Sequence, residues 1–176
     1  MKFSDIKKFP FASYNVTIGW LFLQDWLDRH NEDILKVDMD PEYQRGYIWT
    51  LRQKVLYIEY QLKGGFSGRD IFWNCPTWMH FNDKENIIEL VDGKQRINTV
   101  LEFLNNKIPV FGNYYYKDFE DSLDFLEPRL NFHVNNLKSR KEVIEWYIGF
   151  NAGGSIHTEE DLKPAFELLK RLENEI

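Results

Sequence analysis

The five consecutive residues Asp92-Gly93-Lys94-Gln95-Arg96 carry the strongest chemical signal in the chain. They follow the apolar run 87–91, which predicts a strand, and they open a segment with helical spacing. The amide N–H groups at the start of a helix attract anions such as phosphate, and Gly93 lets the backbone approach a ligand closely. Arg96, one turn into the helix, can bind a phosphate through two hydrogen bonds. The carboxylate of Asp92 suits Mg²⁺ binding or proton acceptance from an attacking hydroxyl.

The same residues also fit an ordinary helix start. In this alternative Asp92 is the N-cap, Gly93 makes the turn, and Lys94 and Arg96 are solvated. Helix caps are common and phosphate sites are not, so the local pattern by itself favours the cap. The segment is not a P-loop, because no Gly-x-x-x-x-Gly-Lys-Ser/Thr occurs in the chain.

A second signal is the segment Tyr43-Gln44-Arg45-Gly46-Tyr47, in which aromatic rings flank an arginine. Such a combination can stack on a base and hold a phosphate, so Tyr47, together with Trp78, is a candidate for stacking on a nucleobase or on DNA. The alternative is that these rings pack into the core. Glu59 lies within a predicted helix, where a lone glutamate is more often simply solvated.

Composition excludes several classes of protein. The formal net charge is −6 and the sequence pI is about 5.3, and no basic tail is present, so tight nonspecific DNA binding is not expected and DNA contact needs a local patch. Cys75 is the single cysteine, which excludes an intrachain disulfide and favours a reducing cytoplasm. None of the four histidines is spaced from another as metal ligands are, so each is more readily structural or exposed. The chain has no apolar run long enough for a signal peptide or a membrane span.

The elements that must position these residues follow from periodicity and caps. Interleaved strands and helices, without a linker or a repeat, predict one α+β domain over 1–176. The predicted strands are 34–37, 70–74, 87–91, 130–134 and an edge strand at 108–111. The first predicted helix has Thr17 as its N-cap. The next three are 51–63, capped by Thr50, 94–105 and 139–150. The last runs from the N-cap Thr158 to about 174, with Asp161 in the capping-box position.

Four motifs, taken in order, resemble those of one family. Residues 40–49 (DPEYQRGYIW) resemble its Pro-x-x-Gln-Arg-x-x-x-Trp signature, and 56–64 (LYIEYQLKG) look like its next helix. Residues 91–100 (VDGKQRINTV) resemble its Val-Asp-Gly-Gln-Gln-Arg-Leu-Thr-Thr core, and 150–158 (FNAGGSIHT) its Leu-Asn-Thr-Gly-Gly element. This family is the N-terminal domain of GmrSD-type, modification-dependent restriction proteins, which is related to the ParB and sulfiredoxin fold. The resemblance covers about 15–172.

The resemblance implies a small mixed sheet with a helical C-terminus, and a turn that holds nucleotide phosphate. Carried over by position, Asp92, Gly93, Gln95 and Arg96 form the phosphate and metal site, with Lys94 in place of the usual glutamine. Gln44 and Arg45 form the facing loop, and Glu59 is an acid/base candidate. With the resemblance added, the residues 92–96 are better explained by a nucleotide site than by an ordinary helix cap.

The resulting hypothesis is Mg²⁺-dependent binding of a nucleoside triphosphate (ATP, GTP or CTP), with hydrolysis or phosphotransfer, in a DNA-linked phage or restriction context. No HNH-like arrangement occurs, so we expect no DNA cutting by that route. Two alternatives stay open. The first is a module that binds DNA or a modified base without catalysis, and the second is a protein that binds and blocks a larger restriction protein.

Overall fold

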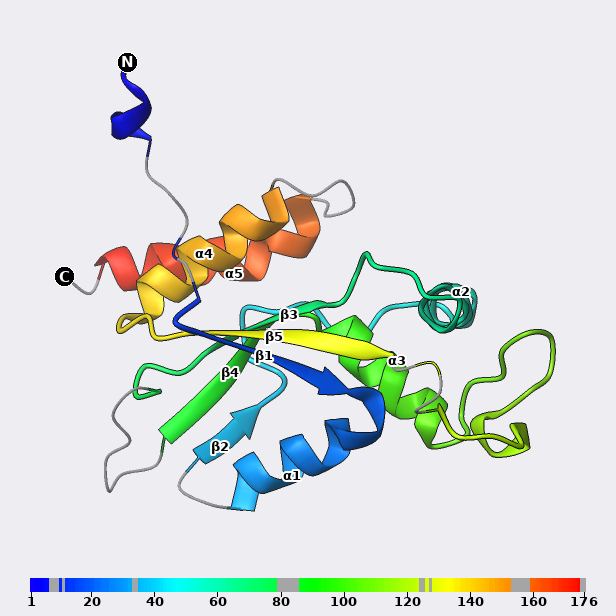
Figure 1. Cartoon of the computed structure of the whole chain (residues 1–176). Coiled ribbons are helices and arrows are strands. Elements are labelled where there is room, and N and C mark those ends of the chain that lie inside the picture. Colours follow the sequence, from blue (N-terminus) through cyan, green and yellow to red (C-terminus); the bar gives the residue numbers. More distant parts are fainter. Residues whose placement is uncertain are drawn as a thin grey trace.

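The computed structural model describes residues 1–6, 10, 12–32, 35–78, 86–123, 126, 128–152 and 159–174. Within this part, five strands form one mixed sheet in the order β1-β5-β3-β4-β2 (Figure 1). The strands are β1 (Tyr14–Gly19), β2 (Leu35–Asp38), β3 (Asp70–Asn74), β4 (Asn86–Asp92) and β5 (Arg129–Asn135). Pairing is antiparallel for β1–β5 and β3–β4, and parallel for β3–β5 and β2–β4.

Helices lie on both faces of the sheet (Figure 1). The α-helices are α1 (Leu23–Glu32), α2 (Leu51–Leu62), α3 (Lys94–Leu104), α4 (Arg140–Ala152) and α5 (Glu159–Asn174), and the short 3-10 helices are η1 (Phe3–Asp5), η2 (Trp20–Phe22) and η3 (Tyr116–Asp118). In Figure 1, α1 and α3 lie below the sheet, and α4 with α5 lies above it. The predicted α+β class, with a mixed sheet and a helical C-terminus, is confirmed. The relation to the ParB and sulfiredoxin fold stays a prediction.

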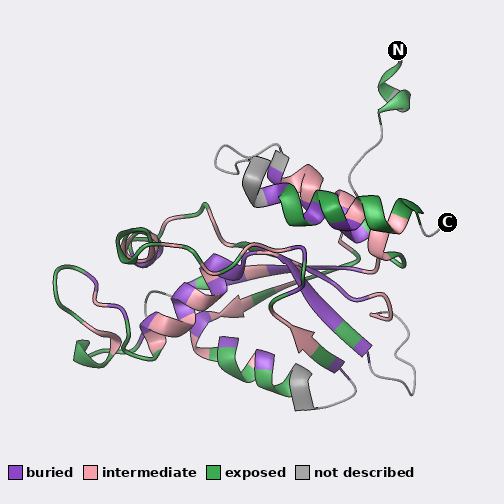
Figure 2. Cartoon of the chain, turned by 180° about the vertical axis from the view of Figure 1, so that it is seen from behind, coloured by how far each residue is buried: buried purple, intermediate pink, exposed green. Residues whose placement is uncertain are grey.

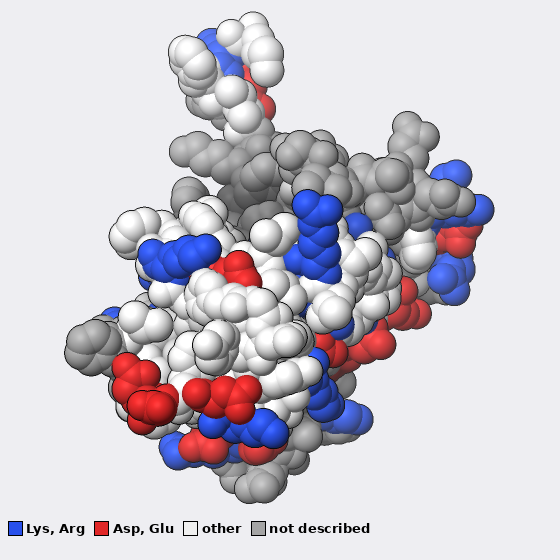
Figure 3. Space-filling model, turned by 90° about the vertical axis from the view of Figure 1, so that its right-hand side faces the viewer, with Lys and Arg blue, Asp and Glu red and all other residues white. Residues whose placement is uncertain are grey.

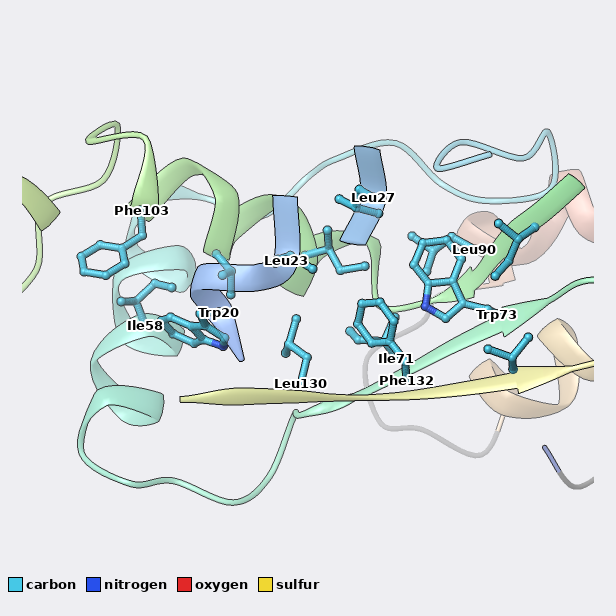
Figure 4. Close-up of a cluster of buried hydrophobic side chains, with 14 of the residues drawn as sticks. Trp20, Leu23, Leu27, Ile58, Ile71, Trp73, Leu90, Phe103, Leu130 and Phe132 are labelled. Atoms are coloured by element: carbon cyan, nitrogen blue, oxygen red, sulfur yellow. The ribbon is translucent and has the colours of Figure 1, made fainter. Parts of the chain in front are cut away.

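Two hydrophobic clusters match these two layers. The larger cluster joins the sheet to α1, α2 and α3, and includes Trp20, Trp73, Phe103 and Phe132, which are at most 1% exposed (Figure 4). On α3, buried Ile97, Val100 and Phe103 recur at three-residue spacing and face this cluster. Figure 2 shows the buried stripe along α3 and the central strands.

The second cluster packs α4 and α5 against the opposite face. It contains Val143, Ile144, Trp146 and Tyr147 from α4, Leu162, Ala165 and Leu168 from α5, and also Tyr43 and Val91. Among the described residues, no helix has the length and apolar character needed to cross a membrane.

Two elements predicted from the sequence are not found in the structure. Thr17 does not cap a helix: it lies in β1, where Val16, Thr17 and Ile18 are β-branched residues that favour a strand, and its hydroxyl donates to Asn131 Oδ1 at 3.3 Å. The segment 108–111 is not an edge strand either. Phe111 has a φ of 48° and Gly112 one of 98°, so the chain turns and only an isolated bridge joins Val110 to Tyr114.

The other predicted elements are confirmed within one or two residues. Thr50 caps α2, and it forms a capping box with Gln53. Thr158, predicted to cap the last helix, and Gly153 and Gly154 of the fourth motif lie outside the described residues.

Candidate functional site

The turn between β4 and α3 has an unusual helix start. Gly93 is the N-cap residue, with a φ of 115°, and it has no side chain with which to cap the helix. The first intrahelical bond runs from Ile97 N to Gly93 O at 3.0 Å, and no described residue accepts a hydrogen bond from the amide N–H groups of residues 94–96. The alternative in which Asp92 is the N-cap is therefore wrong. Three backbone donors and the positive end of the α3 dipole remain available to an anion.

Glycine is required at this turn by both conformation and space. A Cβ on Gly93 would lie 2.5 Å from Cδ1 and 3.1 Å from Cγ2 of Ile71, which is fully buried on β3. A positive φ also disfavours any residue with a Cβ. The sheet therefore presses directly on the turn and fixes the start of α3.

Asp92 and Arg96 form an ion pair across one turn, between Asp92 Oδ2 and Arg96 Nη2. Their side chains are 34% and 22% exposed, so both can be reached from solvent. Arg96 Nε is buried and has no hydrogen-bond partner among the described residues. An unpaired buried donor costs about 1–3 kcal/mol, which makes this guanidinium an incompletely satisfied group at the mouth of the turn.

Lys94 and Gln95 direct their side chains away from the helix start, toward the segment 40–49. Gln95 Oε1 accepts hydrogen bonds from the amides of Ile48 and Trp49, each at 3.0 Å, and its Nε2 donates to Gly46 O at 2.8 Å. Lys94 Nζ forms an ion pair with Asp40. Both side chains hold the loop, while their backbone amides remain at the turn.

Lys94 Nζ also donates to Arg45 O at 3.4 Å, which brings the backbone of Arg45 close to the start of α3. Gln44 is tied to β4, because its Nε2 donates to Leu90 O, and its own amide donates to Pro41 O at 2.9 Å. The structure thus places the predicted facing loop, with Gln44 and Arg45, beside residues 92–96.

Tyr47, on the loop, contacts α3 farther from the turn, at Thr99 and Glu102. Its hydroxyl donates to Glu102 Oε2 at 3.0 Å and lies 3.1 Å from Thr99 Oγ1, and Lys54 Nζ lies 4.0 Å from the centre of its ring. Burial is the largest cause that raises the pKa of Tyr47 above 10.0. The lysine occupies one face of this ring, so a stacked base would have to use the other face.

Glu59 and Trp78 do not join the residues at the turn. Glu59 Oε1 accepts a hydrogen bond from Phe111 N at 2.7 Å, on the segment that follows the C-terminal end of α3. Trp78 comes after β3 and packs on Tyr14, with ring centroids 5.3 Å apart. Because β3 runs antiparallel to β4, the end of β3 that leads to Trp78 points away from Asp92.

A buried polar cluster that the sequence did not predict connects the loop, the sheet and α4. Glu89, on β4, is 7% exposed; Tyr43 Oη donates to its Oε2 at 3.1 Å, and Arg140 Nη1 pairs with the same oxygen. Burial is the largest cause that raises the pKa of Tyr43, and the neighbouring Glu89 carboxylate raises it further. The available signal was Glu89 itself, a single charge inside the apolar run 87–91.

Figure 3 shows lysine, arginine, aspartate and glutamate side chains interspersed around uncharged surface on the face it presents. Among the described residues, no group of three or more His, Cys, Asp and Glu is arranged to hold a metal ion. Asp92 is the carboxylate at the turn, and it is paired with Arg96.

The family model described as "GmrSD restriction endonuclease, N-terminal domain" matches residues 23–173. The chain belongs to this family. The match includes the Gly93 turn, the facing loop and the helices that pack on the sheet, and it places the domain in a restriction or defence context. No curated protein and no solved structure matches the chain.

Proposed function

We propose that this GmrSD-type domain binds a nucleoside triphosphate at the start of α3, with Mg²⁺, and hydrolyses it or transfers its phosphate. The observation that supports this function is the uncapped helix start, where Gly93 leaves the amides of residues 94–96 open beside Arg96 and Asp92. Sites that bind phosphate at helix starts rely on such backbone donors.

Each residue has a separate role in this proposal. The amides of residues 94–96 bind phosphate oxygens, and Gly93 lets those oxygens approach the backbone. Arg96 turns from Asp92 to the phosphate and compensates its charge. Arg45 reaches the ligand from the facing loop, which Gln95 and Lys94 hold in place. Phosphoryl transfer depends mainly on positioning and on charge compensation, so a small site of this kind is sufficient.

The donor set also fits a magnesium ion. Mg²⁺ commonly binds one or two carboxylates together with phosphate oxygens and water, and Asp92 is one partly exposed carboxylate beside the open amides. When bound, the ion would compensate charge on the phosphates. Asp92 would hold it after releasing Arg96.

Titration calorimetry with ATP, GTP and CTP in Mg²⁺ tests the proposal, with Arg96→Ala as the variant. Arg171→Ala, an exposed arginine in the last turn of α5, is the matched control. We expect at least one triphosphate to bind the wild-type chain and the control, and binding to Arg96→Ala to be lost. Phosphate release, measured on the same samples, then separates an enzyme from a nucleotide switch. No binding of any of the three nucleotides would refute the proposal.

The family match also supports two partners, DNA and a larger restriction protein. Because the net charge is −6, we propose that any DNA contact is local and sensitive to salt. A gel-shift assay at low salt with modified and unmodified duplexes tests the first partner. Co-purification with a GmrSD-type nuclease tests the second.

A further inference from the structure

The face of the sheet that carries Asp92 also carries Phe72, which packs against Trp146 and Phe150 of α4, and beyond it the polar residues His133 and Asn15 toward β1. Directly paired residues point to the same face, and Asp92 pairs with Phe72, Phe72 with His133, and His133 with Asn15. Stacking of the Phe72 and His133 rings, with centroids 4.9 Å apart, confirms that these two side chains share one face.

Asp70 lies in the adjacent row of this face, two residues before Phe72 on β3. It is therefore the diagonal neighbour of Asp92, a position that places the two Cα atoms ~7–8 Å apart. Its neighbour Ile71 contacts Gly93 from the opposite face of the sheet, because successive strand residues point to opposite faces, so Asp70 is related to the start of α3 through Asp92.

The hydrogen bonds that hold the Asp70 side chain all involve one of its two carboxylate oxygens. Its Oδ1 lies 2.8 Å from His133 Nε2 and accepts a hydrogen bond from Asn131 Nδ2 at 3.3 Å. No described residue donates to its Oδ2, and the side chain is 53% exposed. His133 is held in turn, because its Nδ1 lies 2.6 Å from Asn15 Oδ1. The result is a fixed acceptor that faces solvent, one row away from the phosphate site.

We infer that Asp70 binds the ribose hydroxyls of the nucleotide, so that the site selects ribonucleotides over 2′-deoxyribonucleotides. This inference rests on the proposed function. Ribose lies one phosphate chain away from the terminal phosphate, a reach that matches the diagonal step from Asp92 to Asp70. A carboxylate with a free oxygen is the group that accepts hydrogen bonds from ribose hydroxyls in dinucleotide sites. In the same row as Asp70, Thr17 on β1 pairs with Asn131 and is one of the residues that line a hollow of about 510 Å³.

Calorimetric titration of the full chain with ATP, GTP and CTP, each beside its 2′-deoxy counterpart, tests the inference. For the nucleotide that binds best, we expect about tenfold tighter binding of the ribose form, the effect of one hydrogen bond to a charged group. Asp70→Ala should bring the two forms within about twofold of each other, and Asp70→Asn should do so in part. Asp121→Ala, an exposed loop carboxylate, is the control and should keep the full preference.

The outcomes separate this inference from the proposed function. If ribose and deoxyribose forms bind wild-type chain equally, or if the preference survives Asp70→Ala, Asp70 does not bind ribose, while the phosphate site stands. If no triphosphate binds the wild-type chain, the proposed function itself fails and this inference fails with it. Circular dichroism and a thermal melt of each variant check the fold.

Discussion

Replacing Gly93 with alanine tests whether the sheet fixes the start of α3 as the structure indicates. The backbone there has a φ of 115°, and a Cβ would lie 2.5 Å from Cδ1 of Ile71. Placing alanine at a positive φ costs about 1–2 kcal/mol. Forcing an extra methyl group against a fully buried side chain costs about 1–3 kcal/mol more. We therefore expect Gly93→Ala to lower the free energy of unfolding by about 2–5 kcal/mol.

Gly112→Ala supplies the matched control. Its φ is 98°, but no atom lies within 4 Å of the Cβ that would be added, so only the conformational cost applies. Urea unfolding of wild type and both variants, followed by tryptophan fluorescence, gives the comparison. Ile71→Val removes Cδ1, so in the Gly93→Ala background it should recover part of the lost stability. In the wild-type background the same substitution should not raise stability, and a double-mutant cycle measures the difference. A Gly93→Ala variant no less stable than Gly112→Ala would refute the packing argument.

Two further predictions concern the loop that faces the turn. Gln95→Ala removes three hydrogen bonds to the backbone of residues 46–49, so hydrogen exchange at the Ile48 and Trp49 amides should accelerate strongly. Gln53→Ala is the control, because it removes the α2 capping box and should leave these two amides protected. The pKa of Tyr43 is raised in the folded state, so its contribution to stability is full below pH 10.0 and is lost as the pH rises above that value, where the unfolded chain ionises first. Unfolding free energies measured from pH 9 upward should fall less steeply for Tyr43→Phe than for wild type, and equal slopes would contradict the assignment.

Most helices and strands could be predicted because each has a local cause. The Thr50 cap, the apolar run before Asp92 and the glycine at 93 act over a few residues, and the structure places all three as expected. The strand β1 was missed as a whole, because Ile18, Leu21 and Phe22 also fit a helical period. What decides the matter is pairing with β5, more than a hundred residues later, and this pairing leaves no local trace.

The candidate site also contains residues that a local motif predicts and residues that only the fold brings together. The Gly93 turn and its charged neighbours follow from a motif, so they could be identified without a structure. Asp70 and His133 could not, because they are 63 residues apart and meet only through the parallel pairing of β3 and β5. The same holds for Glu89 and Arg140, which come together only when α4 folds back onto the sheet.

Lys94 and Gln95 show how one short motif serves two purposes. Their backbone amides belong to the open start of α3, while their side chains bind the loop 40–49 on the other side. A substitution at either side chain therefore leaves the backbone donors in place and changes only the support of the loop. Under the proposed function, phosphate binding should depend on Gly93 and Arg96 first, and on Lys94 and Gln95 to the extent that Arg45 must be held near the ligand. The charge of Lys94 is already paired with Asp40, so it adds less to anion attraction than its position in the sequence suggests.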